Sequence, residues 1–250
     1  MSIRLRAFFV IVLTNLAIIL FSVFAGVFYV SKSIESSQEM DLSMVANIAD
    51  HFISSEIEVL KLKAAAVAQS LAASEEAEWM EVLTSRGTLF PEFIGMAVLE
   101  AGRGLIASAG ELPAFPELME DKYVKMAFLG EKTISSTIPS IKGVVFYMAV
   151  PMPGMPGRIL TLTIPGMHFA ARLSTIVIWE TGHIFIDDEE GHVIANAREE
   201  WVQNRVNFIH RSETDKEYEA IAGVIKRGVR GETGIGRFSI SGAFPCLESS

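Results

Sequence analysis

A cluster of histidine and acidic side chains in the last third of this 250-residue sequence has the composition of a metal site. His183 and His192 flank Asp187 and Asp188 across an expected hairpin, where facing side chains lie close together. The acidic run lacks the ligand pattern of a calcium loop, and an acidic turn is usually solvated. No Cys/His pair has zinc spacing. The sequence therefore predicts no metal site.

A glycine-rich stretch at residues 228–236 invites comparison with a phosphate-binding loop. Such a loop leaves a strand and opens a helix, so that backbone amides and the helix dipole face the anion. Here the expected order is helix, glycines, strand, which favours a simple connection. No nucleophile–base motif of a known hydrolase class occurs, and the paired acids Glu199 and Glu200 carry no local sign of acid–base work. We expect no catalysis and no cofactor.

The distribution of charge excludes nucleic acid as a partner. The chain has 21 Lys and Arg against 30 Asp and Glu, a formal net charge of -9. Residues 1–32 contain Arg4, Arg6 and Lys32 and no acid, so the remainder is more acidic still. An acidic surface repels phosphate backbones. The lone Cys246 excludes a disulfide scaffold, and the 50% apolar content excludes intrinsic disorder.

The segment Phe8 to Val30 is uncharged and apolar throughout. As a helix it spans roughly 34 Å, enough for a bilayer core of about 30 Å. Arg4 and Arg6 precede it, so the positive-inside rule places residues 1–7 in the cytoplasm and residues after about 31 outside it. A cleaved signal peptide is the alternative, but its apolar region is only about 7–15 residues long. We predict an uncleaved transmembrane helix over residues 8–30, anchored in the lipid of a bacterial inner membrane.

Residues 31–73 are expected to continue as a long stalk helix. Ser33 to Ala73 contain neither Pro nor Gly, and apolar residues such as Met44, Ile48 and Phe52 recur near helical spacing. A helix of about forty residues would be about 60 Å long. Such a stalk can pair with a second copy, so we expect a homodimer.

The periodicity changes over residues 74–164, which we interpret as a first module with an antiparallel sheet. Ser74 marks a new helix start. The expected hairpin joins Phe93–Glu100 to Leu105–Ala109. The remaining expected elements are a short helix and three strands: Asp121–Leu129, Thr133–Thr137, Gly143–Pro151 and Arg158–Ile164. Strands with helices before and between them indicate an α+β fold.

A connecting helix is expected over residues 165–178, with His168 and Arg172 on one face. Residues 179–250 would then form a second module. Its expected elements are a hairpin across the acidic turn with Gly191 at positive φ, a capping box at residues 214–217, the helix behind it and a strand over Arg237–Ser241.

The order of these elements resembles the double Cache (PDC-like) sensor regions of bacterial transmembrane receptors, over about residues 31–245. The resemblance is carried by GHIFIDDEEGHVIANAREEWVQN, by GETGIGRFSISG, and by DKYVKMAFLGEKTISS followed by GVVFYMAVPM. It implies two PAS-like modules on a stalk and a receptor of the chemotaxis, histidine kinase or diguanylate cyclase type. The family continues with two more strands and a second membrane helix, so the resemblance implies a C-terminal truncation and an incomplete second module.

Two departures from the family bear on the ligand. Amino-acid-binding members carry an Arg-x-Trp-Tyr-like run where this sequence has Asp121, Lys122 and Tyr123. Amine-binding members place an Asp at the end of the last strand of the first module, where this sequence has Thr163. A buried cationic amine needs a paired charge. Amines and amino acids are therefore poorly supported, and an apolar, neutral or carboxylate ligand stays open.

The expected ligand site is the concave face of the first sheet and the short helix beside it. Pockets are mostly apolar and carry a few polar groups, and Lys122 offers a cation for a carboxylate. The candidate residues are Lys122, Tyr123, Phe146, Tyr147, Met148 and Thr163.

The sequence thus predicts the extracytoplasmic, small-ligand sensing region of a membrane receptor. Two other classes stay open at this point. A membrane-anchored exported hydrolase would need a nucleophile and a base, which the sequence does not supply. A tethered binding or scaffold protein would need no small ligand.

Overall fold

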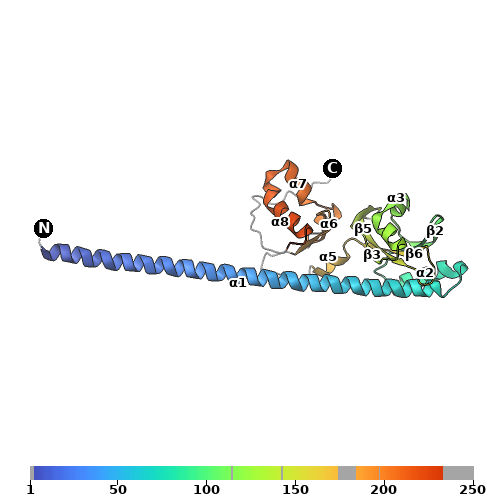
Figure 1. The fold of residues 1–250 in the computed structure, drawn as a ribbon, viewed down its shortest axis with the longest axis horizontal. Coiled ribbons are helices and arrows are strands. Elements are labelled where there is room, and N and C mark those ends of the chain that lie inside the picture. Colours follow the sequence, from blue (N-terminus) through green and yellow to red (C-terminus); the bar gives the residue numbers. More distant parts are fainter. Residues whose placement is uncertain (1–2, 114, 142, 174–183, 197, 233–250) are drawn as a thin grey trace. The chain divides into compact units, whose positions relative to one another are not determined.

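The computed structural model describes residues 3–113, 115–141, 143–173, 184–196 and 198–232 (Figure 1). The chain divides into two compact units, residues 1–48 and 49–250. The first unit consists of the N-terminal part of one helix. The second contains the end of that helix, a six-stranded sheet and a two-stranded sheet.

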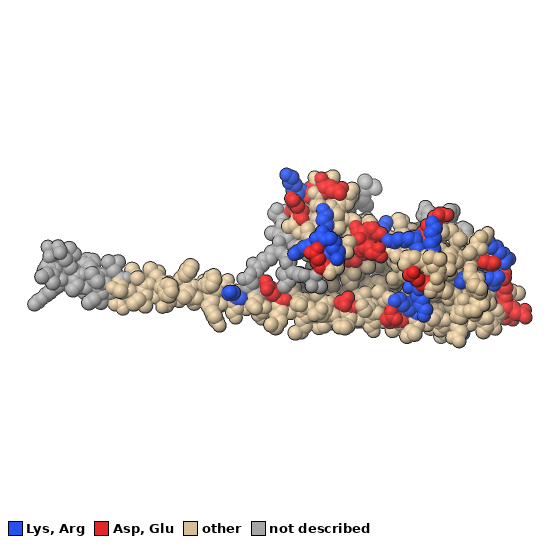
Figure 2. All heavy atoms as spheres, viewed as in Figure 1, with Lys and Arg blue, Asp and Glu red and all other residues tan. Residues whose placement is uncertain are grey.

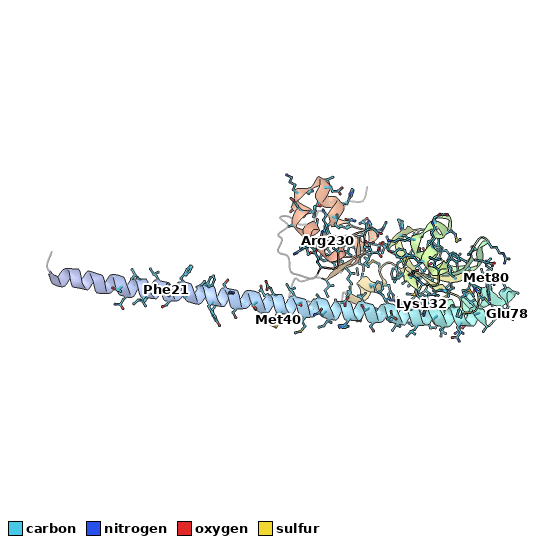
Figure 3. All side chains as sticks on the ribbon, viewed as in Figure 1. Phe21, Met40, Glu78, Met80, Lys132 and Arg230 are labelled. Atoms are coloured by element: carbon cyan, nitrogen blue, oxygen red, sulfur yellow. The ribbon has the colours of Figure 1, made fainter. Side chains whose placement is uncertain are left out.

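Helix α1 (Ile3–Ala72) runs through the expected membrane segment and the expected stalk without a break. The absence of Pro is consistent with its continuity, and Gly26 is the one glycine of this helix. Phe21 is 73% exposed and Met40 66% exposed, and both project from the helix (Figure 3). The described atoms of residues 14–31 carry no charged group (Figure 2). Among the described residues, α1 is the one helix whose length and composition suffice to cross a membrane.

Within the second unit, the C-terminal turns of α1 supply one wall of the core. Leu60, Ala64, Val67 and Leu71 are fully buried and recur every three or four residues. This spacing places them on one face of the helix. The chain then turns through η1 (Glu76–Glu78) and α2 (Trp79–Leu89), and Trp79 anchors the turn by donating its indole N–H to the Leu71 carbonyl at 2.9 Å.

The larger sheet is antiparallel, with strand order β2-β1-β6-β5-β3 and with β4 also paired to β5 (Figure 1). Two short helices cross between its strands. The elements are β1 (Gly95–Glu100), β2 (Gly104–Gly110), α3 (Phe115–Glu120), α4 (Lys122–Phe128), β3 (Thr133–Ile134), β4 (Ile138–Ser140), β5 (Gly143–Pro151) and β6 (Arg158–Pro165).

These elements confirm the expected α+β class and most of the expected strands. The prediction of a strand over Thr133–Thr137 was wrong in extent, because β3 ends at Ile134. The Ser135 side chain explains the early end: its Oγ accepts a hydrogen bond from the Tyr147 backbone N–H at 2.9 Å. A side chain that takes a ladder position ends regular pairing. Helix α3 and strand β4 were not predicted.

The sheet buries both of its faces, and strand alternation sorts its residues between them. Phe146, Met148 and Val150 face a cluster that includes Leu60 and Val67 of α1. Tyr147 and Ala149 face the opposite way, into a smaller cluster that contains Leu118, Val124 and Ala127 of α3 and α4. The face below α4 therefore forms a separate, smaller core.

The connecting helix α5 (His168–Leu173) begins later than predicted, and residues 174–178 of that prediction lie outside the described residues. The late start follows from the pairing with β5, since β6 runs to Pro165 and the Gly166 N–H still donates to the Val144 carbonyl at 2.8 Å. His168 and Arg172 share one face as expected, because both contact the Glu56 carboxylate, at 3.0 and 3.2 Å.

The remaining described elements surround the second hairpin. They are β7 (Phe185–Asp187), β8 (Val193–Asn196), α6 (Glu199–Gln203), α7 (Phe208–Thr214), η2 (Lys216–Tyr218) and α8 (Glu219–Val229). The hairpin is confirmed, with Gly191 at φ +82°. The capping box was wrong: Thr214 ends α7, and Asp215 caps the next turn by accepting the Glu217 N–H. Helices α6 and α7 were not predicted, and the expected strand Arg237–Ser241 lies outside the described residues.

Candidate ligand-binding site

Tyr147 lies at the centre of the sheet face below α4. The side chain is 1% exposed, and its hydroxyl has no hydrogen-bond partner among the described residues. Burial, and after it the nearby Asp121 carboxylate, raises the pKa of Tyr147 far above its ordinary value, so the phenol is neutral. A buried polar atom without a partner costs about 1–3 kcal/mol. The hydroxyl therefore marks a point where a polar ligand atom would be stabilised.

Asp121 is held beside Tyr147 by the start of α4. It is the N-cap of that helix, with an extended backbone, and its side chain accepts the Tyr123 N–H at 2.7 Å. N-cap Asp residues satisfy one of the free N–H groups of the first helical turn. The same carboxylate thus caps the start of the helix and lies close enough to Tyr147 to raise its pKa.

Thr163 lies directly opposite Tyr147 in the pairing of β5 with β6. Directly opposite residues project from the same face of a sheet, so the Thr163 hydroxyl and the Tyr147 phenol share the side facing α4. Thr163 is 1% exposed. Thr161, two residues along the same strand, is also buried and donates its hydroxyl to the Ala97 carbonyl at 3.2 Å.

Phe146 and Met148 do not join this group. They project from the opposite face of β5 into the core formed with α1. Phe146 stacks on Phe169 of α5 with ring centroids 5.1 Å apart. The strand period of two separates both residues from Tyr147, which lies between them in sequence.

Lys122 projects toward the acidic turn between β7 and β8, and its side chain is half exposed. Its Nζ lies 3.1 Å from Glu189 Oε2 and 3.3 Å from Glu190 Oε1, and it lies 4.7 Å from the centre of the Tyr123 ring. The hydrogen bond to Glu189, followed by that to Tyr123, raises the pKa of Lys122. The expectation that this ammonium serves a carboxylate ligand has no support in this geometry.

Tyr123 contacts both the core on the α4 side of the sheet and the acidic turn. Its ring packs against the smaller core, while its hydroxyl donates to Glu189 Oε1 at 3.3 Å. Its backbone carbonyl accepts the Thr133 hydroxyl at 2.9 Å. Burial raises the pKa of Tyr123, and hydrogen bonding to Lys122 opposes that shift. Of the six predicted residues, the structure therefore brings Tyr123, Tyr147 and Thr163 to the face below α4.

Sequence reasoning missed the contacts that the acidic turn makes with this part of the chain. Ser136 donates its hydroxyl to Asp188, whose side chain is 6% exposed. Asp188 also accepts the backbone N–H groups of Glu190 and His192, at 3.0 and 2.9 Å. Arg205 Nε donates to the Thr137 hydroxyl at 3.2 Å. Asp at the start of a turn is a known signal, but no sequence pattern shows which distant hydroxyl it binds.

The structure also brings carboxylate and ring atoms of Asp188, Glu190 and His192 within 4.8 Å of one another. Each of these groups already has a partner: Asp188 holds Ser136, Glu190 holds Lys122, and His192 Nδ1 lies 3.3 Å from Asp188. Their arrangement is that of a hydrogen-bonded turn.

Comparison of the fold with solved structures finds sensory domains. The extracellular domain of the histidine kinase mmHK1S-Z2 matches with a TM-score of 0.57 at 15% identity, over 75% of this chain and 81% of the other. The ligand-binding domain of the Pseudomonas aeruginosa amino acid chemoreceptor PctC, in complex with GABA, matches with a TM-score of 0.54 at 14% identity, over 67% and 79%. The sensory domain of the Campylobacter jejuni chemoreceptor Tlp3 with isoleucine bound matches with a TM-score of 0.51 at 9% identity, over 68% and 76%.

These matches agree with the Cache-like architecture expected from the sequence, and at such identities they establish the fold alone. No protein-family model and no curated protein sequence matches the chain.

Proposed function

We propose that this chain is the extracytoplasmic small-ligand sensing region of a membrane signal-transduction receptor, with the ligand bound between the first sheet and α4. The observation that carries the proposal is the Tyr147 hydroxyl. It is buried, it has no partner among the described residues, and it lies beside Asp121 on a sheet face covered by two short helices. The shared fold supports the same assignment, since the matched PctC and Tlp3 domains hold GABA and isoleucine.

The chemistry of the site favours a neutral or amine-bearing ligand. The Tyr147 and Thr163 hydroxyls can donate or accept, and the Asp121 carboxylate accepts. Lys122 is the cation next to Asp121 in sequence, and its ammonium forms ion pairs with Glu189 and Glu190. A carboxylate ligand would therefore meet Asp121 without a compensating cation. This proposal differs in emphasis from the sequence-based expectation, which disfavoured amines and amino acids and left apolar, neutral and carboxylate ligands open.

Binding of a ligand below α4 can affect the second hairpin through contacts made by the first residues of that helix. The first residues of α4 carry Asp121, which faces the site, and Lys122 and Tyr123, which hold Glu189 of the acidic turn. A small displacement of α4 would change both sets of contacts. Coupling requires that the ligand bind the two arrangements with different affinity.

The remaining parts of the proposal concern the membrane and the assembly. Residues 8–30 cross a bacterial inner membrane, residues after about 31 lie outside the cytoplasm, and two copies pair along the stalk. The chain itself carries no catalysis, and its output is of the chemotaxis or two-component type. Support for these parts comes from the apolar, uncharged run of residues 8–30 in α1 and from the receptors whose sensory domains share the fold.

The test is ligand binding by the full chain in detergent micelles. Thermal shift and calorimetry would screen neutral polyols and sugars, amines, amino acids and carboxylates. We expect at least one neutral or amine-bearing compound to bind, and Tyr147→Phe to weaken it about tenfold, the value of one hydrogen bond to a buried partner. The variant without ligand should be as stable as the wild type or more stable, because it loses a buried hydroxyl that has no partner.

Tyr218→Phe is the matched control, since Tyr218 is also buried but lies at the start of α8. It should leave binding unchanged. The proposal fails if no compound of the screen binds to the folded chain, or if Tyr147→Phe and Tyr218→Phe weaken binding equally.

A further inference from the structure

A hollow lies between the second hairpin and α8, away from the face below α4. It has a volume of about 410 Å³. Its walls come from Phe185 of β7 and from Val224, Ile225 and Val229 of α8, and Asp187 borders it at the end of β7. Pockets of 300–1,000 Å³ with apolar walls and few polar groups are typical of small-molecule sites.

Asp187 is the unusual member of this lining. Its Oδ1 is buried and has no hydrogen-bond partner among the described residues. Phe185 and Asp187 both line the hollow, with a register shift of the hairpin between Ile186 and Asp187. The hollow thus brings together a carboxylate, an aromatic ring and apolar residues of α8. Buried charges in proteins are normally paired.

The surroundings reinforce the negative potential of Asp187. Asp188 and Glu189 also border the hollow, and so do Gly228 and Val229 in the last turn of α8, the end of the helix that carries partial negative charge. The basic residues of that turn, Lys226 and Arg227, are not part of the lining. The described lining thus has acids and no base.

We propose that this hollow is a second ligand site, which binds a small organic cation with an apolar body, such as a protonated alkylamine. The ammonium group pairs with Asp187 and lies against the Phe185 ring, since a cation near an aromatic face is attracted by the ring quadrupole. The alkyl group packs on Val224, Ile225 and Val229 of α8. This site shares no residue with the one below α4 and does not depend on the proposed function of that face.

Calorimetry on the full chain in detergent micelles tests the proposal with three four-carbon probes that differ in charge. These are n-butylammonium, 1-butanol and butyrate, at pH 8. We expect n-butylammonium to bind and the neutral and anionic probes to bind at least tenfold more weakly. Asp187→Asn should weaken the binding of n-butylammonium at least tenfold. Glu213 is an exposed acid on α7, and Glu213→Gln should leave this binding unchanged.

Two further variants keep the result interpretable. Val224→Phe narrows the hollow without changing its charge and should also weaken the binding of n-butylammonium. This variant still tests the site if Asp187→Asn fails to fold. Asp121→Asn alters the site below α4 and should leave this binding intact. If Asp121→Asn, and not Asp187→Asn, removes binding, the probe occupies the first site and the second-site proposal is wrong.

The pH dependence provides an independent readout. Burial, and after it the charge of Asp188, raises the pKa of Asp187 to about 7. Affinity for n-butylammonium should therefore fall about tenfold from pH 8 to pH 6, as the carboxylate takes up a proton. The other titratable groups around Asp187 are Asp188 and Glu189 in the turn and His192, which contacts Asp188, so the titration is repeated with His192→Gln.

Three outcomes would overturn the proposal. Equal binding of 1-butanol and n-butylammonium would show an apolar hollow without charge recognition. Binding that Asp187→Asn leaves unchanged would place the cation elsewhere. Absence of binding by a wild-type chain whose circular dichroism shows the folded state would mean that the hollow is closed to small molecules.

Discussion

Two buried oxygen atoms define the chemistry of this chain at the scale of single residues. Among the described residues, the Tyr147 hydroxyl and Asp187 Oδ1 are the buried side-chain atoms that lack a hydrogen-bond partner. Native folds leave few such atoms, because each costs the free energy of its lost hydration. Tyr147 is neutral, so the free-energy cost of burying it is that of one hydroxyl without a hydrogen-bond partner. Asp187 bears a titratable charge, so its cost depends on pH.

Asp187 makes folding less favourable as pH rises. Its folded pKa is about 7 against an ordinary 3.8, so the folded chain binds more protons than the unfolded chain between those values. Stability then falls from about pH 4 to pH 7 and levels off above it. We expect Asp187→Asn to remove this loss and to gain about 2 kcal/mol over the wild type at pH 8, after allowance for partial exposure.

Urea unfolding of both chains at pH 4.5 and pH 8 measures this difference. The gain should be clearly smaller at pH 4.5, where the wild-type carboxyl is protonated in the folded state and partly protonated in the unfolded state. A gain of the same size at both pH values would mean that it does not come from the charge of Asp187, and a loss of stability at pH 8 would mean that the carboxylate is ionised and paired in the folded protein.

At the scale of elements, the contact between the acidic turn and the first sheet combines strong and weak interactions. Lys122, Glu189 and Glu190 are about half exposed or more. Exposed ion pairs contribute about 0–1 kcal/mol. Asp188 is 6% exposed and accepts hydrogen bonds from Ser136 and from two backbone N–H groups. The buried hydrogen bonds should therefore dominate the stability of this contact.

We accordingly expect Asp188→Ala to destabilise the chain by about 2–4 kcal/mol, since it leaves several buried donors without an acceptor. Lys122→Ala should cost less than about 1 kcal/mol. Thermal unfolding of the two variants ranks them directly. A larger loss for Lys122→Ala would contradict this order of contributions.

For the whole molecule, the exposed face of α1 is the surface that bears on assembly. Phe52, Val59 and Leu62 are 36%, 39% and 69% exposed. Ile48, which is 53% exposed, precedes them, and the successive spacings from Ile48 to Leu62 are four, seven and three residues. That pattern forms an apolar stripe on a helix. Such a stripe, on a helix whose other face packs on the sheet, suits a second copy of the same helix.

Replacing Phe52 and Leu62 together by Glu should therefore shift the chain from dimer to monomer, because like charges would meet across the pair. Sedimentation in detergent, corrected for bound detergent, measures the mass of the complex. Glu58→Gln, which is exposed on the same stretch of α1 but lies off the stripe, is the control and should remain dimeric. A wild-type chain that sediments as a monomer would contradict the expected homodimer.

Local signals in the sequence determined the long helix, the hairpins and most strands. A run without Pro or Gly, a Gly at positive φ, and apolar runs between turn residues act over a few neighbouring residues. The same alternation rule, applied strictly to Phe146, Tyr147 and Met148, would already have shown that Tyr147 faces away from the other two. Helices α6 and α7 escaped prediction because they are five and seven residues long and show little periodicity.

Only the tertiary structure decided which polar groups meet. Lys122 lies next to Asp121 in sequence, yet its charge is taken up by acids 67 and 68 residues away, and Ser136 meets Asp188 across 52 residues. The partners missing at Tyr147 and Asp187 are likewise a property of the packed chain. Burial removes water from a side chain, and the surrounding elements alone determine what replaces it.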